Sequence, residues 1–202
     1  SGRSARHPGV MACCDDTCAP FDGASTAYRR ALLAVIAINA TMFAVEVVAG
    51  LGASSRALLA DALDFAGDAA TYAITLWAIG RPLRTRATAA LLKGLSLALM
   101  AAWVLASTGW QLLVLGLPRA EVMGAVGLLA FAANLASVLI LVRWKDGDAN
   151  VRSVWLCSRN DAIGNLAVIA AAGGVWATAS AWSDLVVAAA MAGLFLTSSV
   201  KI

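Results

Sequence analysis

The sequence predicts an all-α membrane protein with six transmembrane helices. Of its 202 residues, 61% are hydrophobic and 13% are charged, and the mean hydropathy is +0.80. Soluble domains carry about 25% charged residues, and a soluble core could not hide this much apolar surface, so the composition disfavours a cytosolic helical bundle. The apolar segments have about the length of 20 residues that spans a bilayer. They lack the period-two pattern of barrel strands, so helices are expected to satisfy the backbone in lipid.

Six apolar segments follow one another, separated by short polar segments. We expect the spans at residues 28–51, 57–79, 88–113, 121–142, 152–175 and 182–200. Basic residues near the span ends are concentrated at the two termini and in the even-numbered loops, whereas the opposite side has only Arg56 and Arg119. Because loops rich in Lys and Arg stay in the cytoplasm, both termini are predicted to be cytoplasmic in a multi-pass protein of the cell's inner (plasma) membrane.

Residues 1–27 are interpreted as a region separate from the transmembrane domain at 28–202. Residues 1–10 precede Met11 and are interpreted as a tag remnant, followed by a cytoplasmic tail with the sequence MACCDDTCAP. Its three thiols, Cys13, Cys14 and Cys18, lie close enough together to close on one soft metal ion. The alternative is a disordered tail with incidental thiols.

Five acidic residues fall inside the predicted spans, where a carboxylate costs at least about 2.5–3.5 kcal/mol to insert. They are Glu46, Asp61, Asp64, Asp68 and Asp161. Each therefore needs a partner, a cation or a proton.

The spacing of these acids points to a metal site. In the second span, Asp64 and Asp68 are four residues apart and so lie on one helix face; in the fifth, Cys157 and Asp161 have the same spacing. Both pairs fall near the middle of their spans. If the two spans pack together, Asp64, Asp68, Cys157 and Asp161 form a set of three oxygen ligands and one sulfur ligand. Such a tetrahedral set suits Zn²⁺ and Cd²⁺.

Other polar residues of the spans have alternative interpretations. Asp61 caps the second span or bonds a neighbouring helix, and Cys157 could be a small buried hydrophobic residue rather than a ligand. Glu46 and Asn39 are more simply explained by helix packing than by support of the ligands.

Three residues of the fifth span remain as possible accessories to the metal site. Asn160 and Asn165 are possible additional oxygen donors. Arg159 either neutralises Asp161 or reaches the cytoplasmic mouth.

Two motifs resemble the cation diffusion facilitator family of metal/proton antiporters. SSRALLADALDFAGDAA (54–70) is similar to the family's second span, in which a ligand and, four residues later, an Asp follow an LLADA lead-in. NVRSVWLCSRNDAIGNLAVI (150–169) is similar to its fifth span, although Cys157 stands where many members have His or Asp. Members usually continue into a cytoplasmic domain, so the sequence is identified as a short member that lacks this domain, or as a shortened chain.

The resemblance implies proton-coupled export of divalent transition metals, here Zn²⁺ or Cd²⁺, by a homodimer that alternates between inward-facing and outward-facing states. The metal is then a transported substrate, and no resident cofactor or nucleic acid is expected. The rival interpretations are a metal-binding membrane sensor or scaffold without turnover, and a proton-coupled exporter of organic cations. An enzyme is not expected, because the sequence has no nucleophile–base pair and no phosphate-binding loop.

Overall fold

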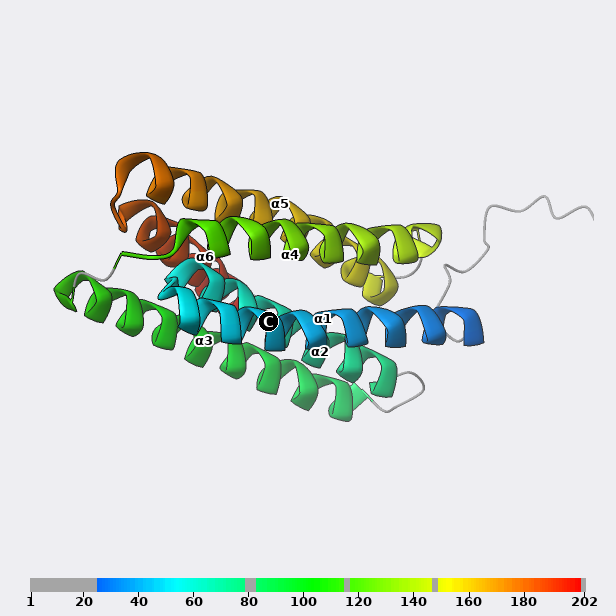
Figure 1. Cartoon of the computed structure of the whole chain (residues 1–202). Coiled ribbons are helices and arrows are strands. Elements are labelled where there is room, and N and C mark those ends of the chain that lie inside the picture. Colours follow the sequence, from blue (N-terminus) through cyan, green and yellow to red (C-terminus); the bar gives the residue numbers. More distant parts are fainter. Residues whose placement is uncertain (1–24, 79–82, 115–116, 147–148, 201–202) are drawn as a thin grey trace, which may run out of the picture.

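The computed structural model describes residues 25–78, 83–114, 117–146 and 149–200, and this part of the chain forms six α-helices (Figure 1). They are α1 (Thr26–Ala53), α2 (Arg56–Ala78), α3 (Leu83–Val114), α4 (Ala120–Leu141), α5 (Ala149–Thr178) and α6 (Trp182–Val200), with a short 3₁₀ helix, η1 (Val142–Trp144), after α4. The predicted all-α, six-helix fold is confirmed. Helices α3 and α5 begin before their predicted apolar spans, because a helix can continue through polar residues beyond the hydrocarbon. The cysteines of the N-terminal tail lie outside the described residues.

Several of these helices are long and apolar enough to cross a bilayer. Within the described residues, three meet this criterion over Thr26–Ala53, Ala120–Trp144 and Val154–Thr178. Shorter apolar helical stretches occur at Ala98–Trp110 and Trp182–Leu194. Helix α2 carries three aspartates within its 23 residues, which lowers its hydropathy although it lies in the same bundle.

The helices pack mainly in three pairs, α1 with α2, α4 with α5, and α3 with α6. Contacts of α1 with α4 and of α2 with α5 join the first two pairs into a four-helix group, and α3 and α6 both adjoin α2. In Figure 1, α4 and α5 run along one side of the bundle and α1, α2 and α3 along the other. The helices that carry the predicted ligands, α2 and α5, therefore belong to one packed group.

Side-chain contacts fix the register of α1 against α4. The rings of Tyr28 and Trp144 meet edge to face with centroids 5.5 Å apart. Farther along, Leu32 belongs to the same buried cluster as Leu141. The two helices are therefore antiparallel, with the start of α1 beside the end of α4.

The register of α1 against α2 follows in the same way. Val35 shares a buried cluster with Tyr72, and Met42 shares another with Phe65. A higher residue number on α1 thus corresponds to a lower one on α2, and these two helices are antiparallel too.

Two apolar clusters close the two ends of the four-helix group. Near the start of α1, the first cluster contains Tyr28, Leu32, Val35, Tyr72, Leu141 and Val154. Near the start of α2, the second is built largely from small residues, including Ala53, Ala57, Leu58, Ala60, Val168 and Ala171. The polar residues midway along α2 lie between these clusters.

Glycines allow the helices to approach closely at two contacts. A Cβ atom on Gly127 of α4 would lie 3.2 Å from Ile169 Cγ1 of α5. At the end of α5, a Cβ atom on Gly174 would lie 2.7 Å from Ser183 Cβ, inside van der Waals contact. Close packing through small residues is the usual way in which membrane helices associate.

The first turn of α2 is capped by a residue from α6. Asp184 is fully buried; its Oδ1 accepts hydrogen bonds from Ser55 Oγ at 2.6 Å and from the Ala57 N–H at 3.1 Å, and its Oδ2 accepts from the Arg56 N–H at 2.8 Å. Ser55 Oγ in turn accepts from the Leu58 N–H at 3.1 Å. The first N–H groups of a helix have no partner within it, and a carboxylate is well suited to satisfy them. Helix α6 therefore fixes where α2 begins.

The outer face of α3 is apolar and exposed. Leu91, Leu95, Leu99 and Trp103 recur every four residues, and each is exposed in the chain. A stripe of this kind would be unfavourable in water but is expected of a helix that faces lipid.

Candidate metal-binding site

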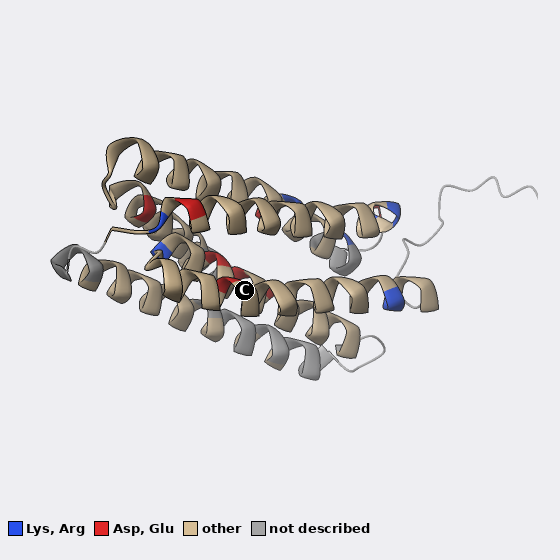
Figure 2. Ribbon diagram, in the orientation of Figure 1, with Lys and Arg blue, Asp and Glu red and all other residues tan. Residues whose placement is uncertain are grey.

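The four predicted ligands lie midway along the bundle. Asp64 and Asp68 are on α2, and Cys157 and Asp161 are on α5. Figure 2 shows one group of acidic residues midway along the bundle and further acidic residues toward the end where α4 begins. The depth of the four ligands in the membrane stays a prediction.

Electrostatic interactions link the two pairs of ligands through Asp161. Its carboxyl group interacts with those of Asp64 and Asp68 on α2 and with the thiol of Cys157 on its own helix. Two carboxylates repel unless a proton or a cation lies between them. The packing of α2 against α5 thus creates a place where positive charge is favourable.

These side chains are near one another but do not form a closed ligand set. Among the described residues, no group of three or more His, Cys, Asp and Glu side chains is arranged so that it could hold a metal ion. The four-ligand site stays a prediction, and it requires side-chain movement from the conformation described here.

Tyr72 is a residue of this site that the sequence reasoning missed. Its fully buried hydroxyl donates a hydrogen bond to Asp68 Oδ2 and lies 3.3 Å from Ser158 Oγ and 3.4 Å from the Val154 carbonyl oxygen. The available signal was its spacing of four residues from Asp68, which places both on one face of α2. The Tyr72 hydroxyl thus takes up one oxygen of Asp68 as a hydrogen-bond acceptor. The Tyr72 ring lies on the side of the site toward the start of α1.

Cys157 has surroundings compatible with both of its interpretations. Its half-buried thiol packs against the apolar cluster that contains Tyr72 and Val154. The thiol is also close enough to Asp161 to act on its carboxyl group. The contacts therefore leave the ligand role as a prediction.

Asp61 interacts with a neighbouring helix rather than capping its own. The cap of α2 is Asp184, so the capping interpretation of Asp61 is wrong. Asp61 is 1% exposed and interacts with the fully buried Glu46 of α1. No local pattern near the start of α2 indicates that its cap would come from α6.

The accessory residues of α5 are placed differently from one another. Arg159 and Asn160 are exposed; the guanidinium lies 5.4 Å from the centroid of the Trp155 ring and donates to Asn160 Oδ1 at 3.4 Å. Their exposure does not favour roles at the half-buried Asp161. Asn165, in contrast, is fully buried, and neither of its amide atoms has a hydrogen-bond partner.

Asparagines of α1 and α4 are also buried and only partly satisfied. Asn39 donates to the Val35 carbonyl oxygen at 2.9 Å, which fits the packing role expected for it, but its Oδ1 has no partner. Asn134, which the sequence reasoning did not single out, is 2% exposed and also has an unpartnered Oδ1.

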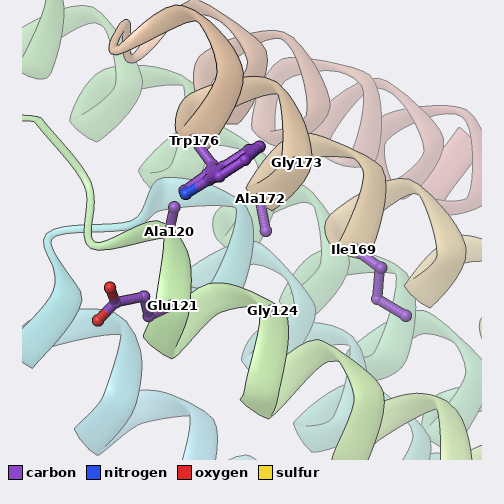
Figure 3. Close-up of a pocket in the computed structure, with 7 residues that line it drawn as sticks. All are labelled: Ala120, Glu121, Gly124, Ile169, Ala172, Gly173 and Trp176. Atoms are coloured by element: carbon purple, nitrogen blue, oxygen red, sulfur yellow. The ribbon is translucent and has the colours of Figure 1, made fainter.

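A cavity of about 260 Å³ lies away from these acids, between the start of α4 and the end of α5 (Figure 3). It is lined by Ala120, Glu121, Gly124, Ile169, Ala172, Gly173 and Trp176. In Figure 3 the Trp176 ring lies beside Ala120, whereas the Glu121 side chain points away from that ring. With one carboxylate on an otherwise apolar lining, this cavity lacks the ligands of a divalent-metal site.

The arrangement of acidic residues inside an apolar six-helix bundle agrees with a comparison against known families. The sequence model of the cation efflux transmembrane domain matches residues 32–202. The chain belongs to the cation efflux family. This is the cation diffusion facilitator family that the two motifs resemble. A comparison with curated proteins found no match.

Membership of the cation efflux family decides the general class of the protein. The chain is a membrane-embedded, multi-helix member of a family of metal cation transporters rather than of enzymes. The described bundle is the matched transmembrane domain, and α2 and α5 are the helices that carry the four predicted ligands.

Proposed function

We propose that the protein exports divalent transition metals, Zn²⁺ or Cd²⁺, from the cytoplasm in exchange for protons. The observation that carries this proposal is the Asp68–Asp161 carboxyl pair in the middle of the bundle, with Asp64 and Cys157 within electrostatic range. Carboxylate and thiolate ligands together favour Zn²⁺ and Cd²⁺ over harder ions such as Mg²⁺. These four residues bind the transported ion.

Proton coupling follows from competition for the same groups. A metal ion binds the deprotonated carboxylates and thiolate, so acidification weakens its binding. The ion enters from the neutral cytoplasm, and protons from the more acidic side displace it after the bundle opens there. The protonated site then returns.

The distribution of basic residues supports the proposed orientation. Exposed Arg29, Arg30, Arg143, Lys145 and Arg152 lie at the end of the bundle where α1 begins. The positive-inside rule assigns this end to the cytoplasm. A homodimer in the inner (plasma) membrane, and capture of soft ions by Cys13, Cys14 and Cys18, are further parts of the proposal.

Flux of Cd²⁺ and Zn²⁺ into proteoliposomes under an imposed pH gradient tests the function. We expect gradient-driven flux in the native chain and its loss in Asp68→Ala and Asp161→Ala. The matched control is Asp146→Ala, which removes an exposed carboxylate between α4 and α5. Retained flux in either site variant contradicts the proposed site, and metal binding without flux in the native chain favours a sensor or scaffold.

A further inference from the structure

A second pair of carboxyl groups is buried between α1 and α2. Glu46 is 0% and Asp61 is 1% exposed, and the two groups interact with each other. The two carboxylate oxygens of Glu46 and Oδ2 of Asp61 have no hydrogen-bond partner. Asp64 also acts electrostatically on Glu46. The pair, with Asp64 in electrostatic range, makes this part of the apolar interior favourable for positive charge. Among the described residues, no three of these acids are already arranged to hold a metal ion, so a cation here would draw the side chains together.

The second pair lies on the same stripe of α2 as the first. Asp61, Asp64 and Asp68 are separated by three and four residues, so they follow one helix face. The distance from Asp61 to Asp68 is about 10 Å along the axis, at about 1.5 Å per residue. Asp64 lies between them, within reach of both neighbouring turns.

A further unpartnered polar group lies between the two pairs. The face of α5 toward α2 is marked by Ser158, which meets Tyr72, and by Asp161, which meets Asp68. Asn165 is one turn farther along this face, and the antiparallel register places it level with Asp64. Asn165 is fully buried, and both of its amide atoms lack partners.

The polar connection runs along the α5 side of α2. On the α1 side, Met42, Phe65 and Ala130 pack together in an apolar cluster between the levels of the two pairs. Asp64 and Asn165 instead supply oxygen atoms at that level. Side chains with oxygen atoms thus form a series from Asp68 and Asp161, past Asp64 and Asn165, toward the end of the bundle where α2 begins.

We propose that Glu46 and Asp61 form a second binding station for the divalent cation, between the Asp68–Asp161 pair and the Ser55 end of the bundle. This inference rests on the proposed function and adds a step to it. The cation passes from the first station to the second before it leaves. Asp64 and Asn165 contact it in between.

The alternative is a neutral, hydrogen-bonded pair that only holds α1 to α2. Glu46→Gln and Asp61→Asn distinguish the two, because each amide keeps the size and hydrogen-bonding capacity of a neutral acid but removes the negative charge. The control is Glu121→Gln, which changes an exposed carboxylate in the first turn of α4.

The first measurement is equilibrium binding of Cd²⁺ to the purified 202-residue chain in which Cys13, Cys14 and Cys18 are replaced by Ser. We expect two classes of site. The weaker class is the Glu46–Asp61 station. It should remain in the double variant Asp68→Ala/Asp161→Ala and disappear when Glu46→Gln is added. A single class of site in the parent chain overturns the proposal, and this result does not depend on whether any site variant folds.

The second measurement is pH-driven Cd²⁺ flux. We expect Glu46→Gln and Asp61→Asn to lower the maximal flux by about tenfold or more, while KM changes by less than about twofold, because the first station is intact. Full flux in both variants overturns the second station but leaves the proposed function standing. Absence of flux in the native chain contradicts the proposed function, and the binding titration still decides the second station.

Discussion

Replacing Asp184 by Ala should strongly destabilise the bundle. Asp184 accepts hydrogen bonds from one hydroxyl and two backbone N–H groups at the start of α2, at 2.6, 2.8 and 3.1 Å. A buried donor left without its partner costs about 1–3 kcal/mol. Some of the three donors will find water at the end of the bundle, so we expect a total loss of about 3–6 kcal/mol. Asp184→Asn keeps one acceptor oxygen and should lose about half as much.

Unfolding in mixed detergent micelles, titrated with a denaturing detergent and followed by circular dichroism, measures these free energies. The matched control is Asp146→Ala, whose side chain is exposed and which should change stability by less than about 0.5 kcal/mol. Equal stability of Asp184→Ala and the native chain would refute the reasoning. A loss for Asp184→Asn as large as that for Asp184→Ala would also contradict it, because the retained oxygen would then contribute nothing.

Three further predictions follow from contacts described above. Gly174→Ala should lower the unfolding free energy by about 1–3 kcal/mol, because the new methyl group would meet Ser183 Cβ at 2.7 Å. The control Gly173→Ala, with open space around it, should be neutral or slightly stabilising. Reversed effects in the same denaturing-detergent titration would show that the contact is unimportant. Tyr72→Phe removes the hydroxyl that donates to Asp68 and so competes with a metal ion for that carboxylate. Calorimetric titration should then show metal binding about two- to tenfold tighter. Weaker binding by a folded variant would contradict the competition between the hydroxyl and the metal ion. Binding of Cd²⁺ should weaken as pH falls, because protons compete for the carboxylates, and pH-independent binding would contradict ligation by them.

The sequence was informative wherever the signal was local. The apolar runs predicted six helices. The spacing of four residues placed Asp64 and Asp68 on one face of α2, and Cys157 and Asp161 on one face of α5, while the metal site that they would form together stays a prediction. Asp184 could not be found this way, because it caps a helix that begins 128 residues earlier in the chain. Periodicity gives the face of one helix, but it does not tell which residue of another helix lies opposite. Tyr72 was within reach of the same spacing rule, yet an aromatic ring in an apolar span also fits ordinary packing.

The apolar clusters at the two ends of the four-helix group have a consequence for the ion gradients across the membrane. Apolar side chains lie between the acids and both ends of the group, with Tyr28, Leu32 and Leu141 at one end and Ala57, Leu58 and Val168 at the other. An open file of carboxylates would leak protons and dissipate the transmembrane potential. Under the proposed export of metal ions, clusters of this kind would make the protein move ions in discrete loads, at a rate set by helix rearrangement rather than by diffusion.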